Sequence, residues 1–75
     1  SGMIEASHEI MDEVHILGGT AALLKVRLWE PNQKKPEFKF KIAASNYDQE
    51  FLKDWEFASE EEAADAFNNL SQNVA

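Results

Sequence analysis

The chain has 75 residues, of which 44% are hydrophobic, and a formal net charge of −7 at pH 7. This length predicts one small domain, and the absence of cysteine excludes a disulfide framework and a thiolate zinc site. The apolar content argues against an acidic disordered tail. No apolar run approaches the roughly 18–20 residues that cross a membrane, so we expect a cytoplasmic protein without a membrane partner. Ser1 and Gly2 precede Met3 as in an expression scar, and the expected domain is residues 3–75.

The segment before residue 18 supports two interpretations. Several residues recur at helical spacing, and Gly18 follows them where a helix often has its C-terminal glycine. The recurring residues are Met3, Ser7, Ile10, Val14 and Leu17. The same segment also fits a strand that turns at Gly18-Gly19 into a hairpin with the residues that follow. We favour the helix and keep the strand as the alternative.

A β-hairpin is predicted in the middle of the chain. In both of its runs apolar residues alternate with other residues, which is typical of half-buried strands. The expected inward set is Leu24, Val26, Leu28, Phe38, Phe40 and Ile42. Residues 30–36 connect the two runs and contain Pro31 and Pro36, which favour a turn and do not fit a central strand.

A third strand is predicted near Phe51 to Phe57, after a loop at residues 45–48. Phe51, Trp55 and Phe57 fall on one face of this strand, but Lys53 falls on the same face and interrupts the apolar pattern. A lysine in that position indicates an edge strand or a β-bulge.

The C-terminal segment predicts a helix from about Glu60 to Gln72. Ser59 and Glu62 have the spacing of a capping box, in which each side chain accepts a backbone N–H at the start of the helix. Glutamates in the first turn also complement the positive end of the helix dipole. The apolar stripe of this helix consists of Ala63, Ala66, Phe67, Leu70 and Val74.

These elements predict an α+β domain, in which the C-terminal helix packs on the inward set of a three-stranded antiparallel sheet. A helical N-terminal segment gives the order αβββα, and a strand gives ββββα. The order αβββα is similar to the topology of double-stranded RNA-binding domains, with Pro36–Ile42 as the second strand. Those domains begin their last helix with glycines and lysines, whereas this chain has Ala58-Ser59-Glu60-Glu61-Glu62, which is of the wrong sign for RNA. The resemblance therefore implies a shared topology without direct nucleic-acid binding.

Charge is distributed unevenly along the chain. Residues 1–17 have four acids and no Lys or Arg, residues 20–41 have six Lys or Arg against two acids, and residues 48–65 have eight acids against one lysine. The hairpin is therefore basic between two acidic segments.

The outer face of the hairpin is the expected partner-binding surface. It combines cations with two apolar residues that have no place in the inward set. The candidate residues are Leu23, Lys25, Arg27, Trp29, Lys39 and Lys41. Two alternatives stay open: Asp54 and Glu56 of the third strand pair with these cations, and the N-terminal segment covers the two apolar residues.

The acidic start of the last helix supports a second kind of surface. Glu60, Glu61, Glu62 and Asp65 resemble the phosphate row of a nucleic acid, although helix capping also explains the glutamates. In a helical N-terminal segment, His8, Asp12 and His15 would share one face at a spacing that suits a transition metal. A solvated polar face is the more common meaning of that pattern, so we assign no metal site and no cofactor.

The sequence predicts a non-enzymatic protein-interaction module that binds another protein or, as a homodimer, a second copy of itself. No nucleotide-binding, hydrolase or metalloprotease motif occurs, and a short domain has little room to desolvate a carboxylate pair. The alternative, from another class, is an acidic inhibitor that mimics nucleic acid and occupies the binding site of a nucleic-acid-binding protein.

Overall fold

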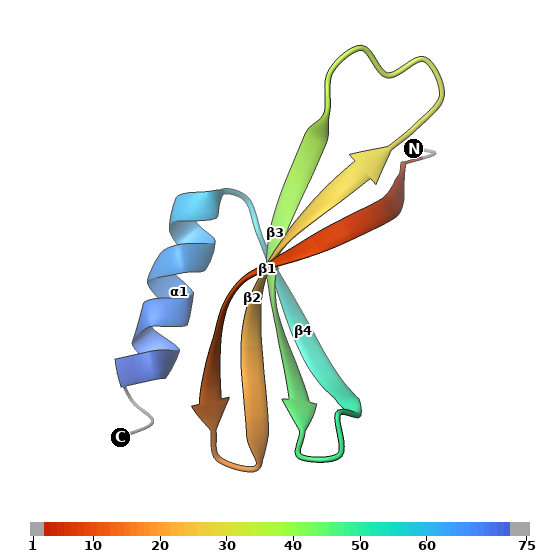
Figure 1. Ribbon diagram of the computed structural model, residues 1–75. Coiled ribbons are helices and arrows are strands. Elements are labelled where there is room, and N and C mark those ends of the chain that lie inside the picture. Colours follow the sequence, from red (N-terminus) through yellow and green to blue (C-terminus); the bar gives the residue numbers. More distant parts are fainter. Residues whose placement is uncertain (1–2, 73–75) are drawn as a thin grey trace.

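The computed structural model describes residues 3–72, so Val74 and the expected scar at Ser1-Gly2 lie outside the described residues. The elements are β1 (Ile4–Ile16), β2 (Gly19–Trp29), β3 (Glu37–Asn46), β4 (Phe51–Phe57) and α1 (Glu60–Gln72). The strands form one antiparallel sheet in the order β1-β2-β3-β4. Figure 1 shows that this sheet is strongly twisted and that α1 lies along one side of it. No helix within residues 3–72 is long and apolar enough to cross a membrane.

The fold is ββββα, which confirms the α+β class, the predicted hairpin, the strand at 51–57 and the C-terminal helix. The expectation of an N-terminal helix is wrong, because β1 pairs with β2 through the turn at Gly18. The pairing of β1 shifts at Ala6 and at Met11, where β1 contains one extra residue. Each such bulge moves the side-chain alternation by one position, so residues on one face recur at an interval of three across a bulge and of two elsewhere. Without a first helix, the topology also differs from that of double-stranded RNA-binding domains.

Two glycines make the β1–β2 turn possible for different reasons. Gly18 has a φ of 88°, which a residue with a side chain adopts only with strain. Gly19 has an ordinary φ, but its α-carbon lies against the backbone of β3, where an added Cβ would overlap the carbonyl oxygen of Ser45. The close approach of β2 and β3 therefore depends on Gly19.

The β2–β3 connection contains the turn that its prolines predict. Pro31 is followed by Asn32 with a φ of 67°, and the Gln33 N–H donates a hydrogen bond of 3.3 Å to the Glu30 carbonyl. Proline followed by a residue with positive φ is the pattern of a type II turn. The side chain of Gln33 also donates a 3.0 Å hydrogen bond to the Leu28 carbonyl, which ties the turn to the end of β2.

The register between β2 and β3 decides which side chains face α1. Leu23 pairs with Ile42, and both are buried beneath Ala63 and Phe67 of α1 in one apolar cluster that also contains Ala21. We call this side of the sheet the helix-side face.

The inward set expected from the sequence is wrong for β2. Leu24 pairs with Lys41 and Val26 with Lys39, so Leu24, Val26 and Leu28 lie on the face opposite α1. The cause is the apolar pair Leu23-Leu24, which allows the alternation of β2 to begin on either residue. A slip of one residue moves every side chain of a strand to the other face.

The start of α1 has a capping box, as predicted. The Glu62 N–H donates to Ser59 Oγ at 3.1 Å, and Glu62 Oε2 accepts the Ala58 N–H at 3.3 Å. In the usual pattern the glutamate accepts the N–H of the capping residue itself, so here it reaches one residue further back. The chain is thereby held where β4 leads into α1.

The helix is shorter than the sheet that it covers. The 13 residues of α1 span about 20 Å at 1.5 Å per residue, whereas the 11 residues of β2 span about 36 Å at 3.3 Å per residue. In Figure 1 the β2–β3 hairpin and the start of β1 extend beyond the helix. The helix-side face is therefore open at the end nearest the 30–36 turn.

The two turn glycines give a test of the register. We expect Gly19→Ala to lower the free energy of unfolding by about 2 kcal/mol or more, because the new methyl group overlaps the backbone of β3. Gly18→Ala meets no neighbouring atom, and only its φ is unfavourable, which costs about 1 kcal/mol. Urea unfolding of both variants shows which of them is less stable. A Gly18 variant less stable than the Gly19 variant would contradict the β2–β3 register.

The packing of α1 is tested at Phe67, which is 4% exposed. Phe67→Ala should lower the free energy of unfolding by about 3–5 kcal/mol. That is a large part of the stability of a domain this small, so the variant should be largely unfolded at room temperature by circular dichroism. Asp65→Ala, at an exposed position of the same helix, is the control and should unfold like the wild type.

Candidate protein-binding surfaces

The open end of the helix-side face brings together exposed apolar side chains and two cations. Trp29 pairs with Ile4 of β1, and Arg27 pairs with Phe38 of β3, so these residues share one face. The exposed fractions are 57% for Ile4, 45% for Trp29 and 42% for Phe38. We define the hairpin patch as Ile4, Lys25, Arg27, Trp29 and Phe38. Exposed aromatic and aliphatic side chains that cluster beside charged groups are typical of binding surfaces.

The cations of the hairpin patch, Lys25 and Arg27, form no ion pair with a carboxylate of the described residues, although Glu9 of β1 pairs with Lys25 in the register. The Lys25 ammonium lies 4.3 Å from the centre of the Phe38 ring, which is a favourable cation–π distance. This contact holds the lysine over the ring, and Arg27 is exposed beside it. Both cations are therefore available to an acidic partner.

The structure brings together only three of the six residues predicted to bind a partner. Lys25, Arg27 and Trp29 lie in the hairpin patch. Leu23 is 6% exposed and belongs to the cluster under α1, so it does not lie on an outer face, and Val14 and Ile16 of the N-terminal segment pack against the same cluster. That segment lies beside Trp29 as strand β1 and leaves the indole about half exposed. The β2–β3 register is the reason that the predicted surface is divided between the two faces of the sheet.

Lys39 and Lys41 lie on the face opposite α1, where they join an ion-pair network. Lys39 Nζ is 2.7 Å from Glu5 and 2.8 Å from Glu56. Lys41 Nζ is 3.1 Å from Glu5 and 3.3 Å from Asp54. The predicted pairing with Asp54 and Glu56 is confirmed for these two lysines. Glu5 was missed, because its role depends on β1 being a strand.

The network covers apolar residues that no helix or strand covers within residues 3–72. Neighbouring strands are about 4.8 Å apart, so the contacts from Glu5 in β1 to the lysines of β3 pass over β2. Beneath them, Val26 of β2 is only 1% exposed. Val26 pairs with Lys39 and the adjacent Leu24 pairs with Lys41, so the aliphatic stems of these lysines are placed to cover the apolar residues of β2 while their charged ends meet the carboxylates. The central part of this face is therefore covered by paired charges.

Hydrogen bonds in the network change the acidity of its members. The bonds from Lys39 and Lys41 lower the pKa of the Glu5 carboxyl group below its usual value. The bonds to Glu5 and Glu56 raise the pKa of Lys39. Burial by itself lowers the pKa of Lys41, but the hydrogen bonds to Glu5 and Asp54 and the attraction of their charges leave it raised.

The polar residues that share a helical spacing in the N-terminal segment do not form a metal site in the described residues. The helical spacing of His8, Asp12 and His15 is lost in strand β1, where Asp12 pairs with a residue of the helix-side face and both histidines point to the other face. No group of three His, Cys, Asp or Glu side chains suited to a metal ion occurs between residues 3 and 72. Glu62 is used in capping.

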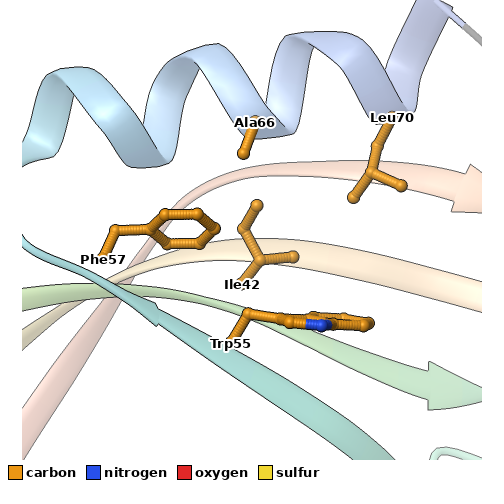
Figure 2. A pocket seen from close by; sticks show the side chains of 5 residues that line it. All are labelled: Ile42, Trp55, Phe57, Ala66 and Leu70. Atoms are coloured by element: carbon orange, nitrogen blue, oxygen red, sulfur yellow. The ribbon is translucent and has the colours of Figure 1, made fainter.

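The sequence interpretation missed an apolar groove between α1 and β4. It has a volume of about 190 Å³, and Figure 2 shows its lining side chains between the helix and the strands. The lining residues are Ile42, Trp55, Phe57, Ala66 and Leu70. Ala66 and Leu70 belong to the predicted apolar stripe of the helix, but the small side chain of Ala66 leaves space above the sheet. Trp55 forms one wall and is 42% exposed.

Strand β4 has both features that Lys53 predicted. It lies at the edge of the sheet, and its register with β3 shifts between the pair Ala44–Lys53 and the pair Ser45–Phe51. The extra residue is Leu52. The bulge places Phe51 on the face opposite α1. Phe51 and Trp55 therefore lie on different faces, contrary to the expectation from the sequence. Below the bulge, the loop is held by Asn46, whose side-chain oxygen accepts the N–H groups of Asp48 and Glu50 at 3.0 and 2.9 Å.

The ion-pair network should give β1 a pH-dependent contribution to stability. Because the folded pKa of Glu5 is lowered, its stabilisation is present above the usual carboxyl pKa and is lost as the pH falls through the folded value. Glu5→Gln should cost about 0.5–1 kcal/mol near neutral pH and almost nothing in acid. The raised lysine pKa values predict a further loss of stability only above the usual lysine pKa. Urea unfolding at several pH values in low salt measures both, with Glu13→Gln as a control; equal effects of the two variants would contradict the network.

Protein-family models, curated proteins and solved structures give no match to this chain. What the chain does must therefore be inferred from its own surfaces. In the described part, the hairpin patch and the groove between α1 and β4 expose apolar side chains on the helix-side face. On the opposite face, paired charges lie over β2, while Ile10 and Phe51 at its sides are exposed.

Proposed function

We propose that the chain is a non-enzymatic protein-interaction module that uses the hairpin patch to bind an acidic segment of another protein. The observation that carries the proposal is the clustering of three exposed apolar side chains with two unpaired cations, at the end of the sheet that α1 leaves open. The cytoplasmic location expected from the sequence belongs to the same proposal.

The residue types of the hairpin patch support this function. Trp and Arg are enriched among the residues that contribute most to binding in protein interfaces, where the aromatic group fills a pocket of the partner. Arg27 can form a bidentate pair with a carboxylate, and Trp29 offers a large apolar surface beside it. Both side chains extend from paired strands, so little backbone entropy is lost on binding.

The charge of the patch favours a different protein over a second copy of the chain. In a symmetric dimer the same patch occurs on both subunits. Arg27 and Lys25 would then face the same cations of the partner copy, and like charges across an interface oppose association. A homodimer formed through the hairpin patch is therefore the less favoured form of the proposal.

The alternative function, an acidic inhibitor that mimics nucleic acid, has one supporting observation. Glu60, Glu61 and Asp65 are exposed in the first turns of α1, and no Lys or Arg among residues 3–72 pairs with them. Exposed acids at a helix N-terminus also stabilise the helix, so the observation does not require a partner. The hairpin patch has the opposite charge and supports the interaction module instead.

Selection from a random peptide library displayed on phage tests the proposal and does not require that the partner be identified first. The enriched peptides should be acidic and contain a bulky apolar residue. Arg27→Glu should weaken their binding at least about tenfold, which corresponds to about 1.4 kcal/mol, and raised salt should weaken wild-type binding. Lys53→Glu makes the same charge change on β4 and is the matched control, so its binding should be almost unchanged. Enrichment of peptides without acids, or binding that survives Arg27→Glu and Trp29→Ser, would refute the hairpin patch as the site.

A further inference from the structure

We propose that Glu5 is a positioning residue for the hairpin patch. Its ion pairs with Lys39 and Lys41, on the face opposite α1, hold the first residues of β1 beside Trp29, so the patch is fully formed only while these pairs are intact. The inference rests on the proposed function, because it concerns the same surface. It makes that surface dependent on charges that lie on the other side of the sheet.

The first step is the position of Trp29 at the end of β2. The last pair between β2 and β3 is Leu28–Glu37, whereas Trp29 pairs with Ile4 of β1. The side chain of Gln33 ties the following turn to the Leu28 carbonyl, one residue before Trp29. Within residues 3–72, β1 is therefore the only strand that pairs with the residue carrying the indole of the patch.

The second step is the weak attachment of Ile4 itself. Strand β1 lies at the edge of the sheet and pairs only with β2 in the described part of the chain. Its register shifts at Ala6, directly after the pair Glu5–Leu28, so a bulge separates the first two residues of the strand from its regular part. Figure 1 shows that α1 does not reach this end of β1. Uncovered strand ends are the parts of a fold that open most easily.

The third step is that Glu5 attaches this end to the middle of the sheet. Its Oε2 atom is 2.7 Å from Lys39 Nζ, and its Oε1 atom is 3.1 Å from Lys41 Nζ. Both lysines belong to β3, so the carboxylate connects the edge strand to β3 across β2. The lysines are held in turn by Glu56 and Asp54 of β4. An isolated exposed ion pair contributes little to stability, whereas a network of several charges contributes more.

The fourth step is the connection between the two faces. Successive side chains of a strand point to opposite faces, so Glu5 reaches the network while the adjacent Ile4 points to the hairpin patch. Cross-strand neighbours such as Ile4 and Trp29 have side chains about 5 Å apart. When the carboxylate is released and the strand end opens, Trp29 loses both its apolar neighbour and its backbone partner. A partner must then order this end again on binding, which costs affinity.

Amide chemical shifts separate this local effect from a general loss of stability. Under conditions where circular dichroism shows the proteins to be folded, Glu5→Gln should move the resonances of Ile4 and Trp29 toward their random-coil values. Raised salt should move the wild-type resonances in the same direction, because salt screens exposed ion pairs. The resonances of the core pair Leu23–Ile42 should stay in place. A lower free energy of unfolding alone would move none of them, since almost every molecule would still be folded.

Two comparisons identify the network as the cause. Glu13→Gln removes the same charge from β1, at a position that forms no ion pair among the described residues, so the resonances of the patch should not move. When Lys39→Gln and Lys41→Gln are already present, Glu5→Gln should add almost nothing, because the partners of the carboxylate are gone.

The acidic peptides selected from the random library measure the consequence for binding. Glu5→Gln should weaken their binding about two- to fivefold, because a smaller fraction of the protein has the patch in place. The direction is informative, since removal of a negative charge by itself favours an acidic peptide. Glu13→Gln makes the same change in net charge and should not weaken binding.

Unmoved resonances of Ile4 and Trp29 in Glu5→Gln would overturn the positioning role. So would peptide binding by this variant that is as strong as in the wild type, or equal effects of Glu5→Gln and Glu13→Gln. The resonances are measured without a peptide. If the library yields no acidic peptides, the function proposed above fails, while the resonances still decide whether Glu5 positions the patch.

Discussion

The pairing of Leu23 with Ile42 is the contact on which the other surfaces of this domain depend. It sets the β2–β3 register and places both residues under α1. The same register puts Lys25, Arg27 and Trp29 on the helix-side face and sends Val26 to the other face opposite Lys39. Because side chains alternate strictly along a strand, no residue of the hairpin can change face without all of them changing. The apolar patch, the ion-pair network and the core therefore form a single consistent arrangement.

The length of α1 decides how much of the helix-side face stays open. Its apolar residues cover the sheet around Ala21, Leu23 and Ile42, and Figure 1 shows the hairpin extending past the helix. The uncovered aromatic side chains are not protected by another element among residues 3–72. On the opposite face, by contrast, paired charges cover the apolar residues of β2. Ile10 and Phe51 are also exposed on the opposite face, but only on the helix-side face do exposed aromatic side chains lie beside unpaired cations. Such a cluster is the arrangement expected of a surface that binds other chains.

The amino-acid pattern predicts the elements of this fold more reliably than their relative placement. The helix from Glu60 to Gln72 follows from local signals, namely capping and an apolar stripe. The faces of β2 were not predictable, because the consecutive Leu23 and Leu24 fit both alternations and the choice depends on contacts with distant residues. Strand β1 was ambiguous because its bulges at Ala6 and Met11 disturb the period of two.

The candidate surfaces also differ in whether local sequence or contacts between distant residues determine them. Lys25, Arg27 and Trp29 could be selected from the sequence because they are cations and an aromatic residue that alternate with the expected inward set of a predicted strand. Ile4 and Phe38 join them only through pairing between strands. The groove was not predictable at all. It depends on how α1 lies over the sheet, which places the short side chain of Ala66 on the same side as Trp55, and no local sequence pattern determines this placement.

Charge is divided within the domain, and this division constrains how it can work. The hairpin patch is basic, and Lys53 lies 5.2 Å from the centre of the Trp55 ring beside the groove, whereas Glu60 and Glu61 are exposed at the start of α1. A head-to-tail contact between copies would bring basic and acidic surfaces together, but such contacts do not close unless the rotation permits and otherwise produce open filaments. The net charge of −7 opposes the approach of many copies. An acidic segment of another protein satisfies the hairpin patch without this cost, and because the strands beneath the patch are paired through β2 and β3, the segment meets a surface already in place.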